Sequence, residues 1–156
     1  MIARSILIAA ATLLLASPVW AQQKVNITAD QFTIDETTRQ AVFTGTVVVT
    51  HPTVTVYAPK VVAFYGEGGT SDIESFEATA DDATPVVRLV TVDQTATGEK
   101  AVFTPSDQLL RLTGNVIVVN AGGTVASEEL VVNLETNVST FTATKGGRVT
   151  GVFTSQ

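Results

Sequence analysis

Apolar and polar side chains alternate along most of the chain with a period of two residues. Between Ala41 and Thr50 the odd positions carry Ala, Phe, Gly, Val and Val, whereas the even positions are richer in threonine. Successive side chains of a strand point to opposite faces, so this pattern predicts a strand with one buried face. After His51 and Pro52 the apolar positions become even, beginning at Val54. Because proline cannot donate to a central ladder, we predict a corner between paired strands at His51-Pro52.

The chain is rich in valine and threonine, two β-branched residues that suit a pleated surface. Few segments have a helical period, and even the run from Glu128 to Val132 is better interpreted as a strand. Glycine and proline divide the chain into short runs, at positions 45, 52, 59, 66, 68, 69, 85, 98, 105, 114, 122, 123, 146 and 147. Short β-rich runs between turn signals predict an all-β fold of sandwich, barrel or roll type.

The sequence also repeats itself. A shift of 69 residues superposes Phe-Thr-Gly-Thr-Val-Val-Val at 43–49 on Leu-Thr-Gly-Asn-Val-Ile-Val at 112–118. The same shift pairs 28–30 with 97–99 without a gap. Because the shift is odd, the inward-facing positions change from odd in the first copy to even in the second. We therefore predict two related halves that stack strand on strand, burying together a face that neither half buries alone.

The N-terminus has the features of an export signal. Arg4 supplies one positive charge, residues 5–17 form a short apolar run, and Pro18-Val19-Trp20-Ala21 ends in the small-residue pattern of a cleavage site. A membrane anchor needs about 20 apolar residues, and Pro18 interrupts this run early. We predict a cleaved signal peptide over 1–21 and a single exported domain over 22–156 that is not embedded in a membrane.

Composition excludes several kinds of chemistry. The 156 residues contain no cysteine, so a disulfide framework, a thiolate metal site and a lipoprotein anchor are ruled out. One histidine, His51, excludes a site that needs two imidazoles. The formal net charge of −6 disfavours nucleic acid as a partner. The chain length suits one domain with its own core.

The carboxylate pairs and glycine-rich segments do not predict an enzyme. Adjacent strand residues such as Glu128 and Glu129 point to opposite faces, so they cannot flank one sugar as a glycosidase pair does. Asp81-Asp82 precedes Pro85 in a segment typical of a solvated turn. The segment Gly66–Thr70 lacks the lysine and the following helix of a phosphate loop. We predict no catalytic residue, no metal ligand and no cofactor.

Three segments resemble the OstA-like family. The first is Phe43-Thr-Gly-Thr-Val-Val-Val, followed by a turn and then by Val54-Thr-Val-Tyr-Ala-Pro-Lys-Val-Val62. The second, 112–118, is closer to the family's F-T-G-N-V-x-V pattern, and the third is the closing run 146–152. The resemblance covers essentially all of 25–153. The chain departs from the pattern at Thr46, where asparagine is usual, and at Pro59, where aspartate is common.

The resemblance implies an all-β fold, an open antiparallel β-jellyroll built from two related halves. It implies a bridge protein that carries lipopolysaccharide from the inner to the outer membrane, with the lipid A acyl chains inside the roll and the sugars in water. The implied partners are an inner-membrane component C and an outer-membrane component D of the same pathway, and further copies of the chain stacked end to end.

The predicted lining follows the apolar positions of the alternation. It consists of Val25, Ile27, Ile34, Phe43, Val47, Val49, Val54, Val56, Leu89, Phe103, Leu112, Val116, Val118, Val125, Leu130 and Leu134. A lipid carrier needs such a lining without a fully packed core, because each exposed CH₂ of the lipid costs about 0.8 kcal/mol in water. Alternation alone favours an ordinary hydrophobic core for these residues, and the family resemblance is what favours a lipid-binding lining instead.

Strand edges are the second expected binding feature. The first strand, predicted over Val25–Phe32, and the last, over Arg148–Thr154, contain no proline and few charges. Such edges suit pairing with a partner's strand. Two alternatives remain open from the sequence: a self-associating structural or adhesive β-repeat module without lipid cargo, and the soluble domain of a related member of the same pathway.

Overall fold

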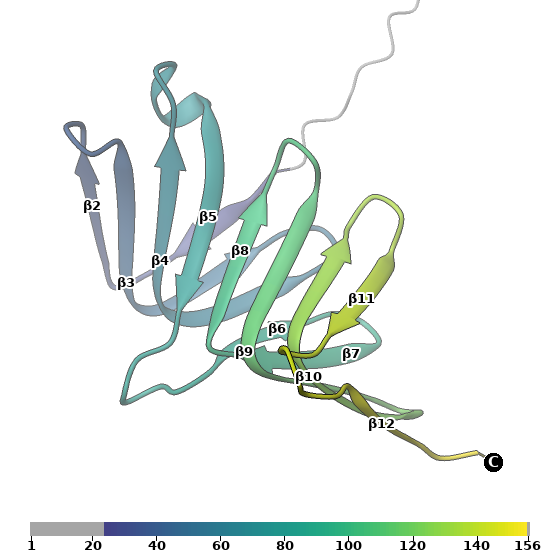
Figure 1. Ribbon diagram of the computed structural model, residues 1–156. Helices are drawn as coiled ribbons and strands as arrows, with labels where there is room; N and C mark the ends of the chain where they lie inside the picture. Colours follow the sequence, from purple (N-terminus) through teal and green to yellow (C-terminus); the bar gives the residue numbers. More distant parts are fainter. Residues whose placement is uncertain (1–23, 156) are drawn as a thin grey trace, which may run out of the picture.

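The computed structural model describes residues 24–155, so the signal peptide expected over 1–21 lies outside the described part (Figure 1). One antiparallel sheet of twelve strands makes up this part, together with a short 3₁₀ turn, η1, at Gly69–Ser71. The strands are β1 Asn26–Thr28, β2 Gln31–Asp35, β3 Gln40–Thr50, β4 Thr55–Tyr65, β5 Ile73–Thr79, β6 Val87–Val90, β7 Gln94–Gly98, β8 Lys100–Thr104, β9 Leu109–Asn120, β10 Gly123–Asn133, β11 Val138–Thr142 and β12 Thr150–Phe153. The all-β prediction is confirmed, and none of the helical segments among residues 24–155 is long and apolar enough to cross a membrane.

The sheet folds over on itself into two layers. The long strands β3, β4, β9 and β10 run through both layers, and each of the eight short strands pairs within one layer (Figure 1). The first layer contains β2, β5, β8 and β11, and the second contains β1, β6, β7 and β12. The result is an open antiparallel β-jellyroll, with the apolar faces of the two layers turned toward each other.

The long strands bend where the ladder slips by a residue. In β3 the register shifts between Thr44 and Val47, and in β9 it shifts at the equivalent place, between Thr113 and Val116. A bulge adds an unpaired residue and bends its strand, so it allows one strand to serve both layers. The glycine at the first bend, Gly45, has a φ of +81°, a left-handed conformation that glycine adopts without steric cost.

The predicted repeat is visible in the backbone. Gly45 and Gly114, which are 69 residues apart, have φ angles of 81° and 85°. The N–H of Asp30 donates to the Gly45 carbonyl at 3.0 Å, and the N–H of Glu99 donates to the Gly114 carbonyl at 3.2 Å. The shift also carries β2 onto β8 and the start of β3 onto the start of β9. The two halves therefore share their bends as well as their sequence.

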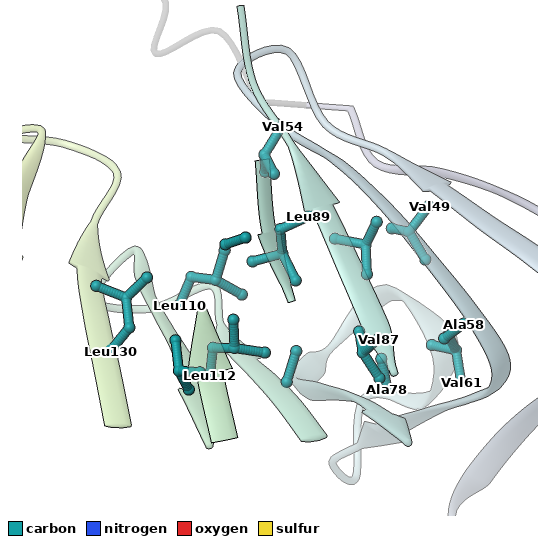
Figure 2. Close-up of a cluster of buried hydrophobic side chains, with 14 of the residues drawn as sticks. Val49, Val54, Ala58, Val61, Ala78, Val87, Leu89, Leu110, Leu112 and Leu130 are labelled. Carbon is teal, nitrogen blue, oxygen red and sulfur yellow. The ribbon is translucent and has the colours of Figure 1, made fainter. Parts of the chain in front are cut away.

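The core lies between the layers (Figure 2). The largest fully buried side chains come from strands of both layers and both halves: Val47, Val61, Val87, Leu112, Val116 and Leu130. Burying an aliphatic side chain of this size stabilises a fold by about 1.5–3 kcal/mol. The second half shows the expected change of parity, since Leu112 and Val116 are even-numbered.

The ends of the sheet differ in detail from the sequence expectation. The first predicted strand, Val25–Phe32, is divided between β1 and β2, which lie in different layers and both pair with β3. The last strand is shorter than expected and covers Thr150–Phe153, and β11 shares its end of the sheet. The break at Asp30 has a physical reason, because its N–H bonds to the bend of β3 instead of to a ladder.

Thr46→Asn is expected to increase the free energy of unfolding by about 1 kcal/mol and so to raise the thermal unfolding midpoint. Thr46 has a φ of +45°, which is costly for a β-branched residue, and its repeat equivalent Asn115 has a φ of +46°. Asn115 also donates a hydrogen bond from Nδ2 to Glu99 Oε1 at 3.1 Å. Calorimetry of the purified protein measures the shift. The matched control, Asn115→Thr, should lower the midpoint, and a lowered midpoint for Thr46→Asn would contradict this account of the bend.

Candidate functional site

The inner faces of the two layers enclose two small apolar cavities. The first has a volume of about 40 Å³ and is lined by Val25, Val49, His51, Val54, Val56, Val61, Phe76, Ala78, Ala101, Phe103, Leu110 and Leu134. The second has a volume of about 30 Å³ and is lined by Val54, Leu89, Thr91, Gln94, Ala96, Leu110, Leu130, Val132 and Leu134. Both lie between the layers, so the interior is the candidate binding site of this chain.

The interior is more completely filled than a ready-made lipid trough. The two cavities have volumes of about 40 and 30 Å³, and aliphatic side chains of the two layers fill the space around them. The sequence predicts an apolar lining without a fully packed core, and in this structure the two cavities are the unfilled part of that interior. An acyl chain that extends beyond these cavities needs the layers, or the loops that join them, to move apart.

Most residues of the predicted lining lie inside. Those that line one or both cavities are Val25, Val49, Val54, Val56, Leu89, Phe103, Leu130 and Leu134. Those packed in the core around them are Ile27, Phe43, Val47, Leu112, Val116 and Val118. Ile34 and Val125 differ: Ile34 is 44% exposed on β2 at the end of the sheet, and Val125 is half-buried opposite Val118.

Simple alternation missed several lining residues because β4 and β10 change phase at the bends. Ala58 and Val61 both face inward although one is even and the other odd, because the β3 bulge lies between their partners Val47 and Phe43. The apolar residues at odd positions 61, 63 and 65 were the signal in the sequence that could have revealed this change of phase. Leu110 fits the even parity of the second copy and lines both cavities.

His51 is the titratable group closest to this apolar interior. It lies in the turn between β3 and β4, so the predicted corner is confirmed. Its side chain is buried, with Nδ1 3.0 Å from the Thr53 hydroxyl and the ring edge-on to Phe103 at a centroid distance of 5.7 Å. Burial lowers the pKa of His51 below its ordinary value of 6.5, since a charged imidazolium loses hydration there.

Charged side chains lie on the outside of the roll. Glu129 forms an ion pair with Arg111 at 2.9 Å, and both side chains are partly solvated. The Arg88 guanidinium lies 4.3 Å from the centre of the outward-facing Tyr57 ring. The predicted turn at Asp81 is present, with Oδ1 accepting a hydrogen bond from the N–H of Thr84 at 2.6 Å. Within residues 24–155 no group of three His, Asp or Glu side chains is placed to hold a metal ion.

Comparisons with known proteins agree with this geometry. Residues 26–138 match the family described as LptA/(LptD N-terminal domain) LPS transport protein. An uncharacterized protein of Rhizobium meliloti (strain 1021) is 32% identical over 130 residues, which cover 81% of this chain and 69% of the relative. The crystal structure of LptH, the LptA-homologous periplasmic component of the lipopolysaccharide transport device of Pseudomonas aeruginosa, has a TM-score of 0.69 at 18% identity. The match covers 85% of this chain and 96% of LptH, and at this identity it shows a shared fold.

Because burial lowers the pKa of His51, we expect stability to fall as the pH is lowered through its ordinary value of 6.5. The unfolded chain then binds a proton that the folded chain takes up only at lower pH, so unfolding is favoured. His51→Gln removes this titration and should flatten the dependence of the thermal midpoint on pH between about pH 7.5 and pH 5.5. An equal slope in the wild type and the variant would contradict the assignment. The Asp35 carboxylate does not interfere, because hydrogen bonds from Thr38 and Thr37 lower its pKa below 3.8.

Proposed function

This chain belongs to the family of LptA and LptD N-terminal-domain lipopolysaccharide transport proteins, and we propose that it is a periplasmic carrier that passes lipopolysaccharide from the inner to the outer membrane. The acyl chains of lipid A enter between the two layers of the roll, and the sugars stay in water. The signal peptide expected over 1–21 supports export, and the family and fold are those of a transport protein and not of an enzyme.

The observation that carries this proposal is the predominantly apolar surface of both inner faces. Eleven of the twelve residues that line the first cavity are apolar, and the twelfth, His51, is the one buried polar or charged residue within 24–155. Carrying a lipid through water requires that its acyl chains stay covered, at about 0.8 kcal/mol for each CH₂. Aliphatic side chains of the two layers supply that cover without polar groups that would lose hydrogen bonds.

The ends of the roll support passage along its axis. At the N-terminal end, Phe32 on β2 is 53% exposed and stacks on Phe43 at a centroid distance of 4.6 Å. At the C-terminal end, Phe153 on β12 is 70% exposed. Phe32 lies opposite the inward-facing Phe43, so the apolar inner face extends as far as the N-terminal opening. A lipid can therefore leave one roll for a neighbour without crossing a polar barrier.

The same ends suit pairing with other proteins. In the described residues, β1 and β2 pair only with β3, and β11 and β12 pair only with β10. Each end therefore presents two short unpaired edges, one in each layer, to which a partner can add strands. The inner-membrane component C, the outer-membrane component D and a further copy of this chain are the proposed partners.

The junction between the two halves provides a template for contact between copies. Inside the chain, β5 pairs with β8 in the first layer, with Ala78 opposite Ala101. Phe32 on β2 is the repeat equivalent of Ala101, and Phe141 on β11 is the equivalent of Ala78, because each faces the same repeat position of a long strand. End-to-end copies would then place Phe141 of one copy opposite Phe32 of the next.

A photo-reactive benzophenone at position 103 is expected to form an adduct with lipopolysaccharide. Phe103 is an aromatic residue in the wall of the first cavity, so an aromatic crosslinker there causes the least change in packing. The matched control is the same group at Tyr57, an aromatic residue on the outer face. Mass spectrometry of the irradiated protein, isolated from a Gram-negative cell, measures the adduct.

An adduct at position 57 without one at position 103 would overturn the proposed carrier. Self-association without any glycolipid adduct would instead favour a structural or adhesive β-repeat module. A lipid carrier and a structural module would share the exposed strand edges, so self-association cannot distinguish them. The glycolipid adduct distinguishes them because only the carrier forms it.

The double variant Phe32→Cys, Phe141→Cys is expected to give a ladder of disulfide-linked oligomers on mild oxidation. Wild-type protein has no cysteine, and the two positions lie at opposite ends of the sheet, so the bond must form between copies. The matched control is Phe32→Cys, Thr140→Cys, because Thr140 neighbours Phe141 on the strand and points to the other face. Equal ladders from both variants on a non-reducing gel would contradict the register.

A further inference from the structure

The two cavities are separated by three side chains that line both of them. Val54, Leu110 and Leu134 are the residues common to the two walls. We infer that these three side chains form a bottleneck for acyl chains along the roll, and that the turn His51–Val54 is the moving part that opens it. This inference rests on the proposed function and adds the place where passage is controlled.

The bottleneck joins the two layers at their open side. Val54 ends the turn between β3 and β4 in the second layer, whereas Leu110 starts β9 and Leu134 follows β10 in the first layer. Val54 is 6% exposed and Leu110 is 4% exposed. Figure 2 shows the side chains of Leu89 and Leu110 reaching toward each other from separate strands, with Val54 near the top of the view. In this arrangement the three side chains stand between the two cavities and narrow the passage for a chain of methylenes.

The first-layer side of the bottleneck is held firmly. Leu110 lies in β9, which is paired on both sides, with Phe103 of β8 and with Val132 of β10 as its direct neighbours. The N–H of Leu134 donates to the carbonyl of Gln108 at 2.9 Å. Moving either residue therefore breaks ladder or loop hydrogen bonds between strands.

The Val54 side is held more weakly. Within the turn, the N–H of His51 donates to the Val54 carbonyl at 2.9 Å and the N–H of Val54 donates to the His51 carbonyl at 3.3 Å. These bonds close the turn on itself and can move with it as a unit. The His51 ring lies edge-on to Phe103 of the first layer, and Val54 packs in the walls of both cavities. The two backbone hydrogen bonds between His51 and Val54 stay within the turn, whereas Leu110 is bonded into a ladder.

Space for such a movement exists on the outer side of the turn. A surface hollow of about 290 Å³ lies between the turn and the tip of the β6–β7 hairpin, lined by His51, Pro52, Thr53, Val54, Thr55, Val90, Thr91 and Val92. A shift of the turn toward this hollow withdraws Val54 from Leu110 and Leu134 and joins the cavities.

The first test compares two valine-to-alanine variants by stopped-flow binding of a pyrene-labelled dodecanoic acid. Val54→Ala removes bulk from the bottleneck and should speed association by about tenfold, the factor that ~1.4 kcal/mol off a barrier gives. Val49→Ala is the matched control, because Val49 is similarly buried and lines the first cavity alone. Equal acceleration in both variants would overturn the bottleneck and indicate general loosening of the core.

The second test measures movement of the turn itself, with labels at exposed positions so that the side chains of the core are unchanged. Because the protein has no cysteine, Thr53→Cys and Ser106→Cys place two spin labels at exposed sites, one on the turn and one on the β8–β9 tip of the first layer. Electron–electron resonance should show this distance increase when purified lipopolysaccharide binds. The control pair, Ser106→Cys with Thr136→Cys, lies on two tips of the first layer and should keep its distance.

The outcomes distinguish movement of the His51–Val54 turn from the proposed carrier function. If lipopolysaccharide co-elutes with the labelled protein while the 53–106 distance stays fixed, the proposed movement of the turn is wrong and the proposed function stands. Failure of lipopolysaccharide to bind to the wild-type chain at all overturns both. A distance that increases equally for both label pairs indicates spreading of the whole roll and overturns the assignment to this turn.

Discussion

The structure depends on one constraint: a long strand can contribute apolar side chains to the inner faces of both layers only if it bends between the layers. Each long strand alternates apolar and polar side chains over 11 or 12 residues, which is too long for one layer of this small domain. The bulges at 44–47 in β3 and 113–116 in β9 provide the bend, with Gly45 and Gly114 in left-handed conformations. Without these bends the apolar face would remain a flat surface exposed to water.

Duplication of this bent unit explains both the closed middle of the molecule and its open ends. In the middle, β5 and β6 of the first half find β8 and β7 of the second half as partners. At the ends, the equivalent strands have no such neighbour within residues 24–155. A repeat that satisfies its own junction once therefore leaves two unpaired edges at each end, one in each layer.

The filled interior is compatible with carrying lipid because the two kinds of contact are chemically alike. Aliphatic side chains such as Val54 and Leu110 are buried in the interior, which stabilises the fold. If the layers separate as we propose, methylenes of an acyl chain would replace the lost side-chain contacts at similar free energy, because burial of apolar surface is not directional. The ligand itself would then offset the cost of opening.

The sequence by itself determined the all-β class, the 69-residue repeat, the corner at His51 and most of the inward-facing residues, because alternation and turn chemistry are local properties of the chain. It did not reveal the inward positions of Val61 and Ala63, since a bulge in β3 shifts the phase of its partner β4. Only the tertiary structure decided that the first predicted strand splits between two layers and that the interior closes to two small cavities. Both depend on how distant strands pack against each other, and no local pattern along the chain records that packing.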